Sequence, residues 1–116
     1  MKRGEQRQLL RRVLQSYTKT VDLEGILRLS GHEAEADEVA RQADALRGEV
    51  DRLRREMWRR WHGGAARLED ALRDQNTRLQ RAIREIERDA RRGADVARTL
   101  GVVEEILTIA RAIGGA

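Results

Sequence analysis

Apolar side chains recur at alternating steps of three and four residues along two long stretches of this chain. The first stretch places them at Ala36, Val39, Ala43, Leu46, Val50, Leu53 and Met57. The second follows Leu68, Leu72, Gln75, Leu79, Ala82 or Ile83, Ile86 and Ala90, with the glutamine as its one polar member. Heptad spacing puts such residues on one face of a helix, and the chain contains no proline that would break it. Each stretch is therefore predicted to be a helix packed along its length on another helix.

Gly63 and Gly64 lie between these two stretches. A glycine after a helix tolerates positive φ, and stretches of matched length can bury their stripes against each other in an antiparallel hairpin. Ser30 followed by Glu33 matches a capping box, which predicts that the first helix begins at Gly31. We predict an all-α, coiled-coil-like hairpin over residues 31–92 that turns at residues 62–64. Its predicted interface is Val39, Leu46, Val50, Leu53, Met57, Leu68, Leu72, Leu79 and Ile86.

Two further helical segments flank this hairpin. Residues 1–30 carry a stripe formed by Leu10, Val13, Leu14, Tyr17 and Val21. Residues 93–116 carry one formed by Val96, Leu100, Val103, Ile106, Leu107, Ala110 and Ile113. With 116 residues the chain is long enough for one modest core. We predict that dimerisation completes a bundle, because two helices leave one side of each stripe uncovered.

The polar faces of the hairpin place an acid four residues before a base, which is the favourable order for helical ion pairs. The predicted pairs are Asp37–Arg41, Asp51–Arg55, Glu56–Arg60, Glu69–Arg73, Asp74–Arg78 and Glu87–Arg91. We interpret these charges as a solvated face.

The net charge of +4 is concentrated at the N-terminal end of the chain. Residues 1–30 hold seven basic and three acidic groups, which leaves seventeen of each sign in the rest. The candidate anion-binding residues are Arg3, Arg7, Arg11 and Arg12. They could bind the phosphates of nucleic acid or of an anionic membrane surface. The alternative, which we favour, is that residues 1–30 belong to the core, because their apolar stripe needs cover.

Residue types that support catalysis are scarce. The chain has no cysteine, which excludes a thiol nucleophile and a cysteine-ligated zinc site. His32 and His62 are the only histidines, and neither stands in a catalytic or metal-binding pattern. No glycine-rich phosphate loop is present. We predict a protein that is not an enzyme and has no catalytic residues, cofactor or metal.

The stretch WHGGAA, Trp61–Ala66, resembles the Trp-x-Gly turn of the WXG (ESAT-like) family of small helical-hairpin proteins linked to type VII secretion. The resemblance implies a secretion substrate, or a partner or adaptor of a larger effector. In that function Trp61, Gly63 and Gly64 close the hairpin and present a helix end for recognition. A purely structural alternative is that Trp61 covers the end of the hairpin as a lid. The family's Tyr-x-x-x-Asp/Glu export signal has no counterpart after the second stretch, since the only tyrosine is Tyr17, so a partner would supply that signal.

These observations predict a helical protein-interaction module. Its partner would be a second copy, a small helical protein or the helical domain of an effector. The alternative function is a coiled-coil module that binds nucleic acid or an anionic membrane surface through residues 1–30. No stretch is apolar enough to cross a bilayer, and no apolar segment follows the basic start as in a signal peptide. We expect a cytoplasmic protein, or one secreted by a signal-peptide-independent route.

Overall fold

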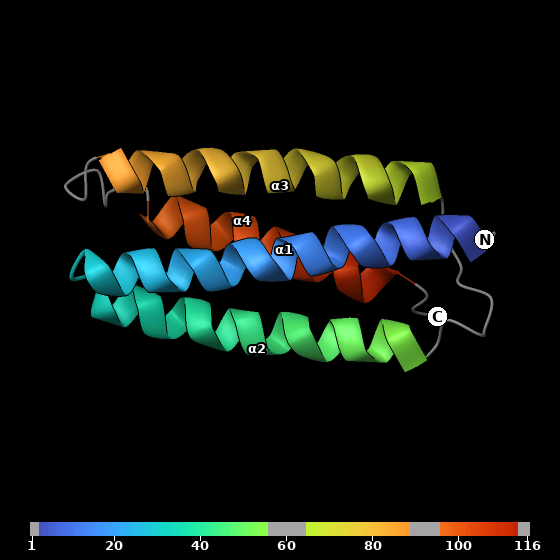
Figure 1. Ribbon diagram of the computed structural model, residues 1–116, viewed down its shortest axis with the longest axis horizontal. Helices are drawn as coiled ribbons and strands as arrows, with labels where there is room; N and C mark the ends of the chain where they lie inside the picture. The colour runs from blue at the N-terminus through green and yellow to red at the C-terminus, as the bar shows by residue number, and fades with distance from the viewer. Residues whose placement is uncertain (1–2, 56–64, 89–95, 114–116) are drawn as a thin grey trace.

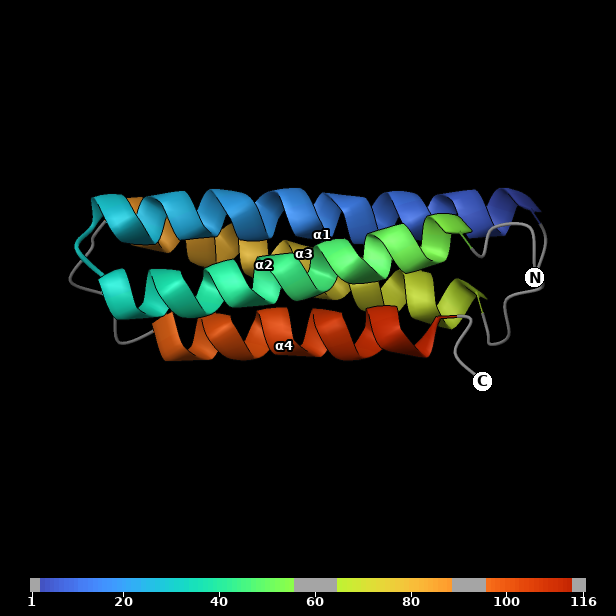
Figure 2. The same ribbon diagram turned by 90° about the horizontal axis from the view of Figure 1, so that it is seen from below.

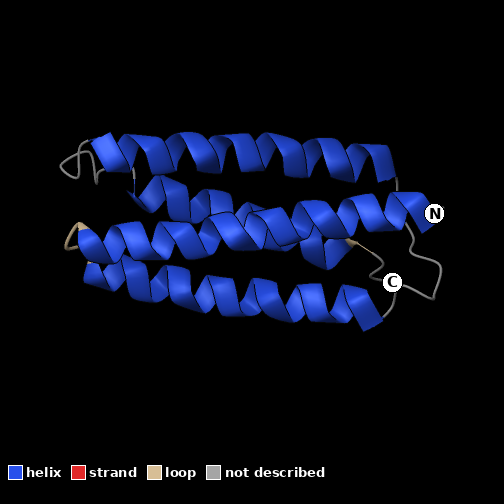
Figure 3. Ribbon diagram, viewed as in Figure 1, coloured by secondary structure: helices blue, strands red, loops and turns tan. Residues whose placement is uncertain are grey.

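The computed structural model describes residues 3–55, 65–88 and 96–113, and these form four helices (Figures 1 and 3). The helices are α1 (Arg3–Leu29), α2 (Glu33–Arg55), α3 (Ala65–Arg88) and α4 (Val96–Ala112). The described part of the chain contains no strand. The prediction of an all-α protein is confirmed.

The four helices lie side by side in a bundle of about 45 × 22 × 18 Å (Figures 1 and 2). Helix α1 packs against α2 and α3, and α4 packs against the same two helices from the other side. Two pairs of neighbours are parallel, α1 with α3 and α2 with α4. Consecutive helices run in opposite directions, so the start of α1 and the end of α4 lie at the same end of the bundle.

The predicted direct packing of the two central helices on each other is wrong. Helices α2 and α3 run antiparallel, but they stand diagonally across the bundle, and α1 and α4 fill the positions between them (Figure 2). Two neighbouring helices cover more of the width of an apolar stripe than one helix does, and the larger buried area favours this arrangement. The predicted turn at residues 62–64, with Trp61, Gly63 and Gly64, lies outside the described residues, as does Met57.

One apolar core runs through the bundle and receives side chains from all four helices. The interface residues expected from the heptad stripes lie in it. Fully or almost fully buried are Val39, Leu46, Val50, Leu53, Leu72, Leu79 and Ile86, and Leu68 is partly buried. Helices of the same chain therefore cover the two stripes that were predicted to face each other within the hairpin.

The two halves of the chain use the same core register. Buried positions of α2 recur 60 residues later in α4 and at the residue that follows it: Val39 and Thr99, Ala43 and Val103, Leu46 and Ile106, Val50 and Ala110, Leu53 and Ile113. Buried positions of α1 recur 59 or 60 residues later in α3: Val13 and Leu72, Ser16 and Asn76, Thr20 and Leu79, Leu23 and Ile83, Leu27 and Ile86. The bundle is thus built from two helix pairs, α1–α2 and α3–α4, whose equivalent helices lie parallel side by side.

Helix α1 is a core helix, but its buried face differs from the predicted stripe. The side chains of Leu14 and Val21 are 37% and 42% exposed, so their assignment to that stripe is wrong. Val13 is buried as predicted, and the other buried residues of α1 are Gln6, Leu9, Ser16, Thr20, Leu23 and Leu27. The prediction failed because polar residues occupy three of these positions. Thr20 Oγ1, for instance, donates a 2.7 Å hydrogen bond to the Ser16 carbonyl, which makes its burial tolerable.

The connection between α1 and α2 is a Schellman motif. The amide of Gly31 donates to the Arg28 carbonyl at 3.2 Å, and the amide of His32 donates to the Leu27 carbonyl at 2.9 Å. Gly31 has a φ of +83°, the left-handed conformation that this motif requires. The predicted capping box with a helix start at Gly31 is therefore wrong: α1 ends at Leu29, and α2 begins at Glu33 after His32, whose carbonyl accepts a hydrogen bond from the Ala36 amide.

Ion pairs also join α1 to α2 at this end of the bundle. The Arg28 guanidinium lies 3.2 Å from both Glu24 and Glu33, and 3.0 Å from Asp37. The hydrogen bonds to Glu24 and Asp37 raise the pKa of Arg28 above its ordinary value. Asp37 therefore does not pair with Arg41 as predicted, because Arg28 of the preceding helix takes its carboxylate and Arg41 binds Glu38.

Candidate anion-binding groove

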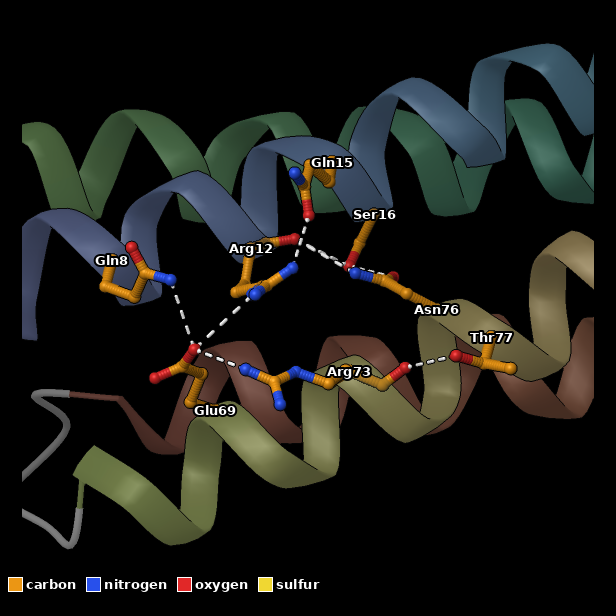
Figure 4. Close-up of polar contacts among 8 residues, drawn as sticks. All are labelled: Gln8, Arg12, Gln15, Ser16, Glu69, Arg73, Asn76 and Thr77. Atoms are coloured by element: carbon orange, nitrogen blue, oxygen red, sulfur yellow. Dashed lines mark hydrogen bonds and ion pairs between the residues drawn. The ribbon is translucent and has the colours of Figure 1, made fainter.

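Polar contacts between side chains join α1 to α3 (Figure 4). Inside the bundle, the hydroxyl of Ser16 lies 2.6 Å from Asn76 Oδ1. Nearer the surface, Lys19 Nζ donates to Gln80 Oε1 at 2.6 Å, and Gln8 Nε2 donates to Glu69 Oε1 at 3.2 Å. The paired residues follow the same order along both helices, as expected for parallel neighbours, and the contacts fix the register of α1 against α3.

A solvent-open groove of about 500 Å³ lies over this interface. Its lining side chains are Arg12, Gln15, Lys19, Arg73, Asn76, Thr77, Gln80, Arg81, Arg84 and Arg88. Six of the ten are cations, three are amides, one is a hydroxyl, and no carboxylate is among them. A concave surface with one sign of charge concentrates field lines and attracts anions.

Helix α3 supplies most of the positive charge. Arg73, Thr77, Arg81, Arg84 and Arg88 follow each other at steps of four, four, three and four residues, which places them on one face of the helix. Arg81, Arg84 and Arg88 have no ion-pair partner among the residues that the structure describes. Like charges at this spacing destabilise a helix by about 0.2–0.5 kcal/mol per pair. The fold therefore carries a row of cations that it does not itself neutralise.

One carboxylate, that of Glu69, stands at the end of the groove nearest the start of α3 (Figure 4). Its Oε1 lies 3.1 Å from an Arg73 guanidinium nitrogen and 3.6 Å from Arg12 Nε, in addition to the hydrogen bond from Gln8. The Gln8 hydrogen bond, with the charges of Arg73 and Arg12, lowers the pKa of Glu69 although partial burial opposes this. Arg12 Nε is buried and has no hydrogen-bond partner, since the carboxylate stays too far away.

The structure divides the four arginines predicted to bind anions. Arg12 lines the groove, whereas Arg11 lies on the outward face of α1 with Leu14, Thr18 and Asp22. This outward face meets the groove at Gln15 and Lys19, which line both. Arg7 is exposed on α1, and Arg3 is the first residue of that helix.

The sequence analysis did not identify the α3 residues that line the groove as candidates for anion binding. Two of the predicted ion pairs that include α3 arginines do form, Glu69–Arg73 and Asp74–Arg78. The same pattern, however, led us to interpret all the α3 charges as a balanced, solvated face. A usable signal was present in Arg81, Arg84 and Arg88, because none of them has an acid four residues before it.

Other kinds of site are not visible in the described part of the chain. Within residues 3–55, 65–88 and 96–113, no three His, Cys, Asp or Glu side chains cluster as metal ligands. Over the same ranges, no helix combines the length and the apolar character needed to cross a membrane. Compared with protein-family models, with curated proteins and with solved structures, the chain matches none of them.

Proposed function

We propose that this protein binds nucleic acid through the sugar–phosphate backbone, in the groove between α1 and α3. The observation that carries the proposal is the row Arg81, Arg84 and Arg88, which faces the groove without ion-pair partners in the described chain. Guanidinium groups bind phosphate oxygens with charge-assisted, often bidentate hydrogen bonds.

The extent of the row favours a polymer over a small anion. Arg81 and Arg88, the ends of the unneutralised row, are seven residues apart on one helix, which corresponds to roughly 10 Å along its axis. Lys19 and Arg12 stand on the opposite wall of the groove. A chain of phosphates can meet several of these cations at once, and each contact releases counterions.

The chemistry of the groove favours nucleic acid over a membrane. Amphipathic helices that bind membranes bury apolar side chains at the acyl boundary, whereas the groove lining consists of cations, amides and one hydroxyl. The lining contains no aromatic side chain on which a base could stack. We therefore expect backbone contacts that are independent of base sequence.

The test compares two triple variants that remove equal charge. Arg81→Gln, Arg84→Gln and Arg88→Gln together neutralise the groove row. Arg47→Gln, Arg54→Gln and Arg55→Gln together remove three exposed arginines of α2 that have no ion-pair partner within residues 3–55, 65–88 and 96–113. Fluorescence anisotropy with labelled single-stranded and duplex oligonucleotides, over a series of salt concentrations, gives the affinity and its salt dependence. Circular dichroism melts establish that both variants fold.

The proposal gives different outcomes for the two variants. The groove variant is expected to lose at least about tenfold in affinity, and the slope of log K against log salt should fall by about 2–3, as for three lost phosphate contacts. The α2 variant should keep most of both. Equal losses of affinity in the two variants would show that binding depends on net charge alone and not on the groove, which contradicts the proposal. The proposal is also refuted if the wild type shows no salt-dependent binding. The proposal is likewise refuted if the wild type binds vesicles of anionic lipid as tightly as it binds the oligonucleotides.

A second proposal retains the function implied by the WXG resemblance. Its support is that α2 and α3, which run antiparallel, flank the segment that contains Trp61 and Gly63. In this function the chain binds a second copy or a helical effector domain. Co-expression with the products of neighbouring genes, comparing wild type with Trp61→Ala and Gly63→Ala, tests the motif. Sedimentation of the purified chain at micromolar concentration tests dimerisation.

A further inference from the structure

Three donors converge on one oxygen at the end of the groove. Glu69 Oε1 accepts a hydrogen bond from Gln8 at 3.2 Å and one from Arg73 at 3.1 Å, and Arg12 Nε lies 3.6 Å away (Figure 4). Two guanidiniums and an amide around one anionic oxygen are also the donor set that binds a phosphate oxygen. The position is built by both helices, since Gln8 and Arg12 belong to α1 and Arg73 belongs to α3.

Arg12 is not satisfied by this arrangement. Its Nε is buried and forms no hydrogen bond with the described residues, because Glu69 Oε1 stays 3.6 Å away, and its side chain is only 23% exposed. A neighbouring nitrogen of the same guanidinium donates to Gln15 Oε1 at 3.2 Å, which fixes the group toward the groove. An anionic oxygen placed closer to Arg12 Nε than Glu69 Oε1 is would accept the hydrogen bond that this buried donor lacks.

We propose that Gln8, Arg12 and Arg73 form an additional phosphate-binding position at this end of the groove, which Glu69 occupies in the free protein. This inference rests on the proposed function, because the phosphate belongs to the same nucleic-acid backbone. Glu69 then limits the length of backbone that the groove engages. Removal of its carboxylate frees two guanidiniums that already point into the groove.

The experiment removes Glu69 and uses Asp74 as the matched control. Glu69→Ala and Asp74→Ala each remove one negative charge from α3; the first releases Arg73 and Arg12, and the second releases Arg78. Arg78, the partner of Asp74, does not line the groove, so its release should not create a phosphate contact there. Anisotropy titrations with the same oligonucleotides over a series of salt concentrations measure both variants. Glu69→Gln, which keeps the shape of the side chain, serves if the alanine variant does not fold.

A double-variant cycle with Arg73→Gln identifies the cations that are released. In the wild type, Arg73 is held by Glu69, so Arg73→Gln should change affinity less than twofold. In the Glu69→Ala background, the same substitution should remove about half of the gain. The expected gain for Glu69→Ala is a salt slope steeper by about 1–2, as for one or two new phosphate contacts.

The outcomes separate this inference from the proposed function. A steeper slope for Glu69→Ala than for Asp74→Ala, together with the Arg73 effect, supports the additional position. Equal behaviour of the two variants, with the wild type still binding through Arg81, Arg84 and Arg88, would overturn the inference and leave the proposed function standing. If neither the wild type nor Glu69→Ala binds nucleic acid, both are wrong.

Discussion

Ser16 and Asn76 meet inside the bundle, where the serine hydroxyl lies 2.6 Å from the asparagine Oδ1. They occupy equivalent positions of α1 and α3, and both side chains are buried. The same hydroxyl is 3.0 Å from the Arg12 carbonyl, to which Asn76 Nδ2 also donates at 3.4 Å. A buried polar pair of this kind penalises any register in which either partner loses the other. Ser16 and Asn76 therefore hold the two walls of the basic groove in register.

Substitution of this pair should show energetic coupling. Asn76→Ala is expected to lower the free energy of unfolding by about 1–3 kcal/mol, because it leaves buried polar groups with fewer partners. With Ser16→Ala already present, the same substitution should cost about 0.5–1.5 kcal/mol less. Urea unfolding of the two single variants and the double variant measures this coupling. Additivity within error would show that the contact does not stabilise the fold.

The corrected face of α1 gives a second test. Leu23→Ala, on the buried face of α1, should lower the free energy of unfolding by about 2–5 kcal/mol, and Leu79→Ala, in the core on α3, should have a similar effect. Leu14→Ala, at an exposed position, should change it by no more than about 0.5 kcal/mol. Chemical denaturation compares the three. A large loss for Leu14→Ala would restore the stripe predicted from the sequence.

Two glycines of the first half should respond to alanine in opposite directions. Gly31 has a φ of +83°, so Gly31→Ala should destabilise the protein by about 1–2 kcal/mol. Gly25 lies within α1, and a Cβ there would meet nothing within 4 Å, so Gly25→Ala should stabilise it by about 0.5–1 kcal/mol. Thermal melts of the two variants, each against the wild type, check both signs. A stabilising Gly31→Ala would contradict the Schellman motif.

The interactions of Glu69 predict a pH dependence. Its pKa in the folded protein is lowered from an ordinary value of 4.5, so between the two values the unfolded state binds more protons than the folded state. The stabilisation is complete above the ordinary value and is lost as the pH falls through the lowered one. The difference in unfolding free energy between wild type and Glu69→Gln should therefore be constant near neutral pH and shrink on acidification below 4.5. A difference that grows in acid would mean that the carboxylate is not stabilised by its neighbours.

The secondary structure and much of the core follow from the sequence. The heptad stripe of α2 is buried at Ala36, Val39, Ala43, Leu46, Val50 and Leu53, as its spacing indicates. The prediction succeeded because a long amphipathic helix has only one apolar face, and that face is the one buried in the core. It was less accurate in α1, where polar Ser16 and Thr20 are buried by virtue of hydrogen bonds that no hydrophobic pattern records.

The sequence by itself determined that this chain forms amphipathic helices, and which residues most of them bury. Only the tertiary structure decided which helices are neighbours, because apolar burial has no direction and does not select a partner stripe. That choice put α1, and not α2, beside α3. It brought Lys19 to within hydrogen-bonding distance of Gln80 and placed Arg12 across from Arg73, pairs that are 61 residues apart in sequence. The basic groove exists because two separately charged helices became parallel neighbours, which spacing within either helix does not reveal.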